Sequence, residues 1–184
     1  ADALAAIAAC EDKQFPGHPP QQVDEMREQA VRALRRVDAA KAATALPVLT
    51  AAVRDRSLRV RRAAVQELAA LRSPEAVPGL VAAVVDEHQQ LYNSTEDDSE
   101  WLAANLREEA LEALGAIRST RAVAPLIEAL HLVHLSKQVT DRIADTLARI
   151  TGRAFEGDRA VEIIDYEGWR VWWDARLRDA PEAP

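Results

Sequence analysis

The feature that most constrains this chain is an internal repeat. The segments LRSPEAVPGL (71–80) and IRSTRAVAPL (117–126) match in residue type at most positions, and a second apolar segment follows each of them. The second segments align on four leucines that lie 34, 46 and 33 residues apart: Leu34, Leu68, Leu114 and Leu147. A period of this size predicts an array of similar units, each packed against its neighbours.

Apolar residues recur at steps of three and four in each unit, as they do on one face of an α-helix. Two of the aligned columns are Ala30, Ala64, Ala110 and Ile143, and then Val31, Val65, Leu111 and Ala144. The first segment of each pair has the same spacing, and we expect Pro47 and Pro78 near its start, where a missing N–H costs little. With only 6 Gly in 184 residues, the chain predicts an all-α fold, an α-α superhelix of about four helical hairpins.

Two insertions interrupt the repeat. The first, EDKQFPGHPP (11–20), has three prolines and a glycine and predicts a surface loop. The second, near 87–100, contains no Lys or Arg and predicts a long acidic loop. Its carboxylates suit a Ca²⁺ ion or a partner, but it lacks the alternating ligands and the turn glycine of an EF-hand, so a solvated loop is favoured.

The repeat array covers residues 1–150, and residues 151–184 differ in composition. Trp169, Trp172 and Trp173 recur at helical spacing and form one apolar stripe. The last unit of a helical array exposes an apolar flank, which an atypical end unit covers. We therefore expect a C-terminal Trp-rich capping helix, preceded by a short extended piece at 161–164.

Composition narrows the class and the compartment. No segment approaches the roughly 20 uncharged apolar residues that a membrane-spanning helix needs, so we expect a soluble protein. The single cysteine, Cys10, cannot form an internal disulfide. The sequence starts at Ala1 rather than Met, and we expect a processed chain or a fragment; a cytoplasmic location is slightly favoured and export stays open.

The motif AVPxL...V.D....VR..A...L, with a period slightly above 30 residues, resembles HEAT repeats in the short bacterial form also described as phycobilisome-lyase-type repeats. The resemblance covers most of residues 1–150, and the ending TG..F...W..W is similar to that of bacterial HEAT arrays. It implies a ladder of hydrogen bonds between an aspartate that ends one helix and an arginine early in a neighbouring one. The aspartates at the ladder positions are Asp55 and Asp86, the arginines are Arg27, Arg61 and Arg107, and Thr140 replaces the arginine in the fourth unit.

Catalytic motifs are missing from the sequence, which has no Gly-rich phosphate loop and no HExxH. The di-iron hydroxylases built on these repeats use paired His-Glu motifs, whereas this chain has Glu87-His88 once and in reversed order. The weak candidates for a Zn²⁺ or Cu²⁺ site are His88, His131 and His134. Ordinary histidines near a helix end are favoured, so we expect no cofactor and rank a metal-dependent or lyase-like enzyme third.

Nucleic-acid binding ranks second among the functions. Residues 27–72 contain 11 Lys/Arg and 4 Asp/Glu, although the whole chain has a net charge of −7. Such a basic segment attracts a phosphate backbone. It contains no aromatic residue on which a base could stack, and the acidic flanks repel the same backbone, so nucleic acid is disfavoured.

A non-catalytic protein-binding scaffold ranks first. Solenoids bind through a long inner surface, lined here by the second helices, and the outward columns of those helices change sign along the array. The predicted partner contacts are Arg59, Arg62 and Gln66 at one end and Glu108, Glu112, Asp141 and Asp145 at the other. This polarity would orient a protein partner of complementary charge, whose identity the sequence does not give.

Overall fold

The computed structural model describes residues 17, 19–34, 42–85, 99–132, 136–153 and 166–179. Within these ranges the secondary structure is helical, without strands. The α-helices are α2 (Pro20–Leu34), α3 (Ala42–Ala52), α4 (Leu58–Leu71), α5 (Val77–Val85), α6 (Ser99–Ile117), α7 (Val123–Ala129), α8 (Lys137–Thr151) and α9 (Tyr166–Asp179). Two 3₁₀ turns, η3 (Pro74–Ala76) and η5 (Thr120–Ala122), lead into α5 and α7.

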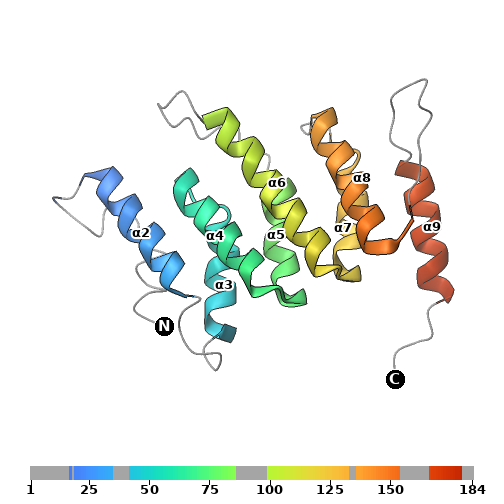
Figure 1. Cartoon of the computed structure of the whole chain (residues 1–184), viewed down its shortest axis with the longest axis horizontal. Coiled ribbons are helices and arrows are strands. Elements are labelled where there is room, and N and C mark those ends of the chain that lie inside the picture. The colour runs from blue at the N-terminus through green and yellow to red at the C-terminus, as the bar shows by residue number, and fades with distance from the viewer. Residues whose placement is uncertain are drawn as a thin grey trace.

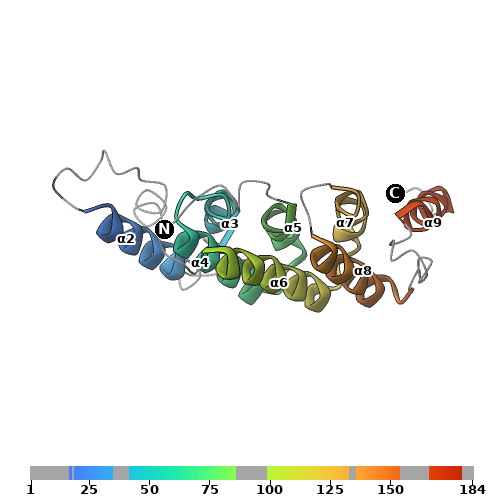
Figure 2. The ribbon, with the colours of Figure 1, turned by 90° about the horizontal axis from the view of Figure 1, so that it is seen from above.

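The helices form two layers that run along the long axis of the molecule. One layer contains α2, α4, α6 and α8, and the other contains α3, α5, α7 and α9 (Figure 2). Within the first layer each helix packs against the next, and α4 and α6 also pack against the first helices of their own pairs. This arrangement confirms the predicted all-α, α-α superhelix (Figure 1).

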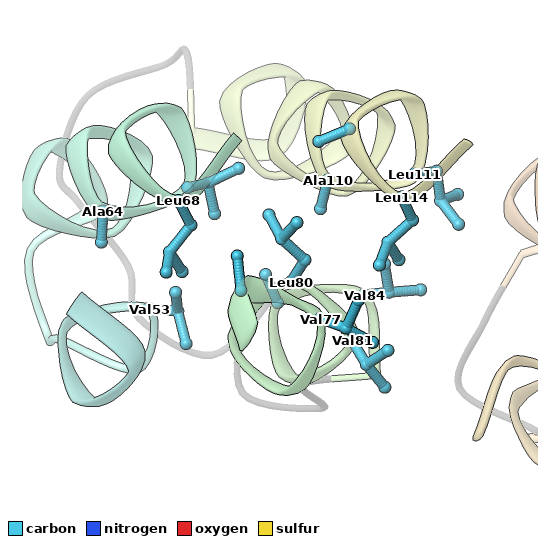
Figure 3. Close-up of a cluster of buried hydrophobic side chains, with 14 of the residues drawn as sticks. Val53, Ala64, Leu68, Val77, Leu80, Val81, Val84, Ala110, Leu111 and Leu114 are labelled. Atoms are coloured by element: carbon cyan, nitrogen blue, oxygen red, sulfur yellow. The ribbon is translucent and has the colours of Figure 1, made fainter. Parts of the chain in front are cut away.

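The core lies between the two layers and is continuous from α2 to α9. The four aligned leucines of the second helices are at most 1% exposed. Leu68 of α4, Leu80 of α5 and Leu114 of α6 point into the same part of this core (Figure 3). The apolar columns of the sequence are therefore the buried faces of the helices, and each column joins one repeat to the next.

Short turns of repeated geometry connect the helical pairs. The Ser73 hydroxyl accepts a hydrogen bond from the Glu75 N–H, and the Ser119 hydroxyl accepts one from the Arg121 N–H, both at 3.4 Å. These contacts satisfy N–H groups that have no partner at a helix start. Just before the serines, Arg72 and Arg118 end α4 and α6 in the left-handed conformation, with φ of 48° and 53°.

One prediction about the prolines was wrong. Pro47 is the sixth residue of α3 and lies inside the helix rather than near its start, because α3 already begins at Ala42. The proline ring is exposed to solvent, and Pro47 has no N–H to donate within the helix. Pro78, the second residue of α5, lies near a helix start as expected.

The C-terminal tryptophan segment is a helix that covers the end of the array. Helix α9 packs beside α7 in the layer of first helices, where the first helix of another repeat would stand (Figure 2). Trp169 is fully buried, and Trp172 and Trp173 are partly buried against the same core. This confirms the capping helix. The division at residue 150 stays a prediction, and the expected extended piece at 161–164 lies outside the described residues.

The two predicted loops also lie almost wholly outside the described residues. Of the segment 87–100, the structure describes only the start of α6 at Ser99. In the helices that are described, none has the length and apolar character needed to cross a membrane.

Candidate functional site

The second helices α2, α4, α6 and α8 lie side by side and present one polar surface, which we call the second-helix face (Figure 1). Their inward positions are taken by the apolar columns, so charged residues occupy the outward positions. All seven predicted partner contacts lie on these helices. They fall into two groups, those that contact a neighbouring side chain and those that do not.

A chain of polar contacts crosses three of these helices. The Arg62 guanidinium of α4 donates two hydrogen bonds to Glu109 Oε1 of α6, at 3.1 and 2.8 Å from Nε and Nη2. Gln66 Nε2 donates to the other oxygen of Glu109 at 3.2 Å, and Gln66 Oε1 accepts from Arg32 of α2 at 3.2 Å. Arg62 and Gln66 are therefore held in place by neighbouring repeats.

Three further predicted residues have weaker charge partners. Arg59 Nη1 is 4.0 Å from Glu25 Oε1, and both side chains are more than 60% exposed. Glu108 Oε1 is 3.7 Å from Arg142 Nε of α8. Asp141 pairs with Lys137 of its own helix at 3.0 Å. Exposed pairs of this kind contribute little to stability and exchange readily with other partners.

Glu112 of α6 and Asp145 of α8 stand apart from the other five predicted residues. Both are exposed, and neither has an ion pair or a side-chain hydrogen bond with any residue that the structure describes. They occupy equivalent outward positions on helices that pack against each other. The unengaged charge at this end of the face is therefore acidic.

Sequence reasoning missed Glu109, which receives both Arg62 and Gln66. Alignment of equivalent columns places Glu108 opposite Arg62, but the structure pairs Arg62 with the next residue of α6. Two adjacent glutamates in the sequence give no signal as to which one reaches the neighbouring helix. The sign change along the columns thus has a structural cause in part, since opposite charges join successive repeats.

Behind this face, buried arginines join the repeats. Arg27 Nη1 of α2 donates to Asp55 Oδ2 at 2.5 Å, and Asp55 Oδ1 accepts the Ser57 N–H at 2.8 Å. Burial raises the pKa of Asp55 above its ordinary value, and the Ser57 N–H and the Arg27 guanidinium oppose that rise. This contact is one rung of the predicted ladder.

The other rungs are described only in part. Arg61 is fully buried at the position equivalent to Arg27, while Asp86 lies outside the described residues. Arg107 is buried and donates from Nε to the Val84 carbonyl at 3.2 Å. In the fourth unit the Thr140 hydroxyl donates to the Lys137 carbonyl of its own helix, so Thr140 makes no link to another repeat through this bond.

The structure describes only one of the three histidine candidates for a metal site, so this site is not tested. His131 is exposed, and its ring lies 4.8 Å from the ring of Tyr166 on α9. His88 and His134 lie outside the described residues. In the part of the chain that the structure covers, no three His, Cys, Asp or Glu side chains are grouped to hold a metal ion.

Five of the 11 Lys/Arg in the basic segment 27–72 are paired with neighbouring carboxylates. Its ion-paired arginines are Arg27, Arg32, Arg56, Arg59 and Arg62. Arg61 is fully buried, and 35–41 lies outside the described residues. A phosphate backbone would therefore have to displace existing pairs at these five arginines, whereas Arg54 and Arg72 are exposed and have no ion pair with a described residue.

Comparison with known families matches two repeat models. A model described as HEAT repeats matches residues 21–97, and a model described as PBS lyase HEAT-like repeat matches residues 106–131. No curated protein and no solved structure matches the chain. The first match begins with α2 and extends past α5, and the second runs from α6 through α7.

Proposed function

Because this chain belongs to the HEAT-repeat family, we propose that it is a non-catalytic protein-binding scaffold whose partner docks on the second-helix face. Repeat solenoids bind through extended surfaces rather than through a single pocket. We assign no catalytic residue and no cofactor. The partner is a protein segment that carries charges complementary to this face.

The observation that carries this proposal is the uneven pairing of charges on the face. Arg62 and Gln66 are held by Glu109, whereas Glu112 and Asp145 have no charge partner among the described residues. An exposed carboxylate that lacks an intramolecular partner keeps its charge available for a ligand. Two such carboxylates on adjacent helices therefore favour a basic group of the partner.

The opposite end of the face supports a defined orientation for the partner. Arg59 is 61% exposed, and its contact with Glu25 is at the 4.0 Å limit of an ion pair. An acidic group of the partner can take the place of Glu25 at little cost, because an exposed pair is worth at most about 1 kcal/mol. We propose that Arg59, with Arg62 and Gln66 behind it, receives the acidic end, and that Glu108, Glu112, Asp141 and Asp145 receive the basic end.

The test is a comparison of proteins captured by the wild type and by charge-reversed variants. Glu112→Lys combined with Asp145→Lys reverses the two unengaged carboxylates without removing a contact that holds the fold. We expect the amount of each specific partner recovered to fall by about tenfold or more, and to fall also when salt is raised.

A matched control separates this surface from net charge. Glu167→Lys, compared with Glu112→Lys alone so that each variant changes the net charge by two, reverses a carboxylate on α9 that is 67% exposed and pairs with Arg170 three residues away. It should leave capture unchanged. Equal losses for Glu167→Lys and for Glu112→Lys would attribute binding to total charge and refute a site on the second-helix face.

A further inference from the structure

The second helices α4, α6 and α8 end along one edge of the array. Their C-terminal ends lie on the lower side of the view in Figure 1. We define the turn edge as residues 70–76, 116–122 and 149–153, which are equivalent positions of successive repeats. It has a single acidic residue, Glu75, and five arginines, which are Arg72, Arg118, Arg121, Arg149 and Arg153. The edge is therefore basic in a chain whose net charge is −7.

Three arginines of the turn edge are available to a ligand. Arg72, Arg118 and Arg149 are exposed, and none has an ion pair with a residue that the structure describes. The arginines of the second-helix face differ, since Arg62 and Arg142 are each near a glutamate. Unengaged cations are thus concentrated at the turn edge.

The backbone at two of these arginines favours a different residue. Arg72 and Arg118 have φ of 48° and 53°, in the left-handed region that glycine adopts without strain. Gly152, with φ of 72°, takes this conformation at the end of α8. Two successive repeats therefore place an arginine where glycine would serve the helix end better.

Contacts between repeats place these residues one after another along the edge. Arg121 Nη1 lies 3.6 Å from Glu75 Oε1 and links the turns that follow α4 and α6. The Arg149 side chain of α8 lies against Gly115, near the end of α6. Packed helices have axes about 8–10 Å apart, and an extended chain advances about 3.3 Å per residue. One residue in three of an extended segment would therefore meet successive repeats, where Arg149 lies two positions before the place that Arg72 and Arg118 take in theirs.

We propose that the turn edge is a second binding surface, which takes an extended acidic peptide segment with a carboxylate at every third residue. Arg72, Arg118 and Arg149 each receive one carboxylate, and Arg121 is freed from Glu75 when the segment binds. This surface is distinct from the second-helix face, whose unengaged residues are acidic. It gives a role to two arginines at positions where the backbone favours glycine.

The probe is a fluorescent synthetic peptide of repeated Glu-Gly-Ser triplets, compared by anisotropy at low salt with its Gln-Gly-Ser counterpart. We expect the glutamate peptide to bind the full chain and the glutamine peptide to bind at least about tenfold more weakly. Arg72→Gly combined with Arg118→Gly should weaken binding of the glutamate peptide by about tenfold. Glycine suits the backbone there, so thermal unfolding should show that the variant stays folded.

Arg72→Lys combined with Arg118→Lys is the matched control. It keeps both charges at the same backbone positions and should bind within about twofold of the wild type. The proposal is overturned if both peptides bind equally, or if the glycine variant binds as the wild type does. It is also overturned if a single-stranded oligonucleotide of equal charge binds more tightly than the glutamate peptide, since that result would assign the edge to nucleic acid.

Discussion

Among single residues, Asp55 makes a polar contact whose loss should destabilise the fold, because it accepts hydrogen bonds from buried Arg27 and from the Ser57 N–H. Asp55→Ala should lower the free energy of unfolding by about 2–3 kcal/mol, as expected for hydrogen bonds to charged groups. Arg27 keeps Asp24 as a partner, which limits the loss. Urea denaturation measures the change, and Asp55→Asn, which keeps an acceptor oxygen, should cost less. Equal stability of Asp55→Ala and the wild type would contradict a stabilising contact between Asp55 and Arg27.

The raised pKa of Asp55 determines how its contribution to stability changes with pH. Its pKa is raised in the folded state, so the folded chain holds this proton to a higher pH than the unfolded chain, whose value is near 3.8. The contribution of Asp55 to stability is therefore complete below 3.8 and is lost as the pH rises through the folded pKa. The stability of the wild type minus that of Asp55→Asn should fall over this window in paired urea titrations. A rising difference would mean that Arg27 outweighs burial.

The sequence predicted which residues of the helices are buried, but it did not predict which charged residues pair across the surface. Leu68 and Leu114 were predictable because helical periodicity alone determines which residues face the core. The contact of Arg62 with Glu109 was not predictable, because it depends on how far α6 is shifted along α4. That shift arises from side-chain packing between repeats, which the sequence pattern does not encode.

Among the helices, α5 depends on a close approach that only glycine allows. A Cβ at Gly79 would lie 2.7 Å from Leu68 Cδ1 and 3.1 Å from Thr50 Oγ1. Leu68 is fully buried, so a shift of its side chain would disturb the packing of the core. Gly79→Ala should therefore destabilise the chain by about 1 kcal/mol, because overpacking exceeds the gain in helix propensity.

Gly115 of α6 provides the matched control for Gly79. Its nearest neighbour would be Arg149 Cδ at 3.4 Å, in a side chain that is free to shift toward solvent. Gly115→Ala should raise stability by about 0.5–1 kcal/mol through helix propensity. Thermal unfolding of both variants tests whether a Cβ at position 79 is overpacked. A stabilising effect of Gly79→Ala would show that α5 packs more loosely against α4 and α3 than described.

Among the tryptophans of helix α9, Trp169 is the one that is fully buried. Trp169 is fully buried, whereas Val171 two residues later is 60% exposed. Trp169→Ala should cost about 3–5 kcal/mol, while Val171→Ala should stay within about 0.5 kcal/mol of the wild type. Circular dichroism melting measures both. If the two variants melted alike, α9 would not be a cap of the array.

The helices were largely predictable from the sequence, except for the start of α3. The tryptophan helix was predictable because Trp169, Trp172 and Trp173 recur at helical spacing. The start of α3 was not, because Pro47 indicates a helix start and the residues before it carry no capping signal. The helix propensity of the alanines before Pro47 favours a helix that begins at Ala42, on the N-terminal side of the proline.

For the whole molecule, the period of the sequence determined the architecture, because a repeating apolar face is buried only by stacking one unit on the next. The candidate binding surfaces were harder to predict. Glu112 and Asp145 were named from their columns, but the structure alone distinguishes them from Glu108 and Asp141, which have charge partners. The basic turn edge escaped notice because four of its arginines lie outside the α-helices, and only Arg149 belongs to one.

The central claim is that a protein partner docks on the second-helix face, and site-specific photo-crosslinking tests it most directly. A photoreactive phenylalanine at Gln138 would sit on α8, exposed and two turns before Asp145, and the same residue at Ala124 would sit exposed on α7 in the other layer. We predict that partner adducts form at position 138, disappear with Glu112→Lys and Asp145→Lys, and do not form at position 124. Adducts at 124 but not at 138 would contradict the account and place the partner on the layer of first helices.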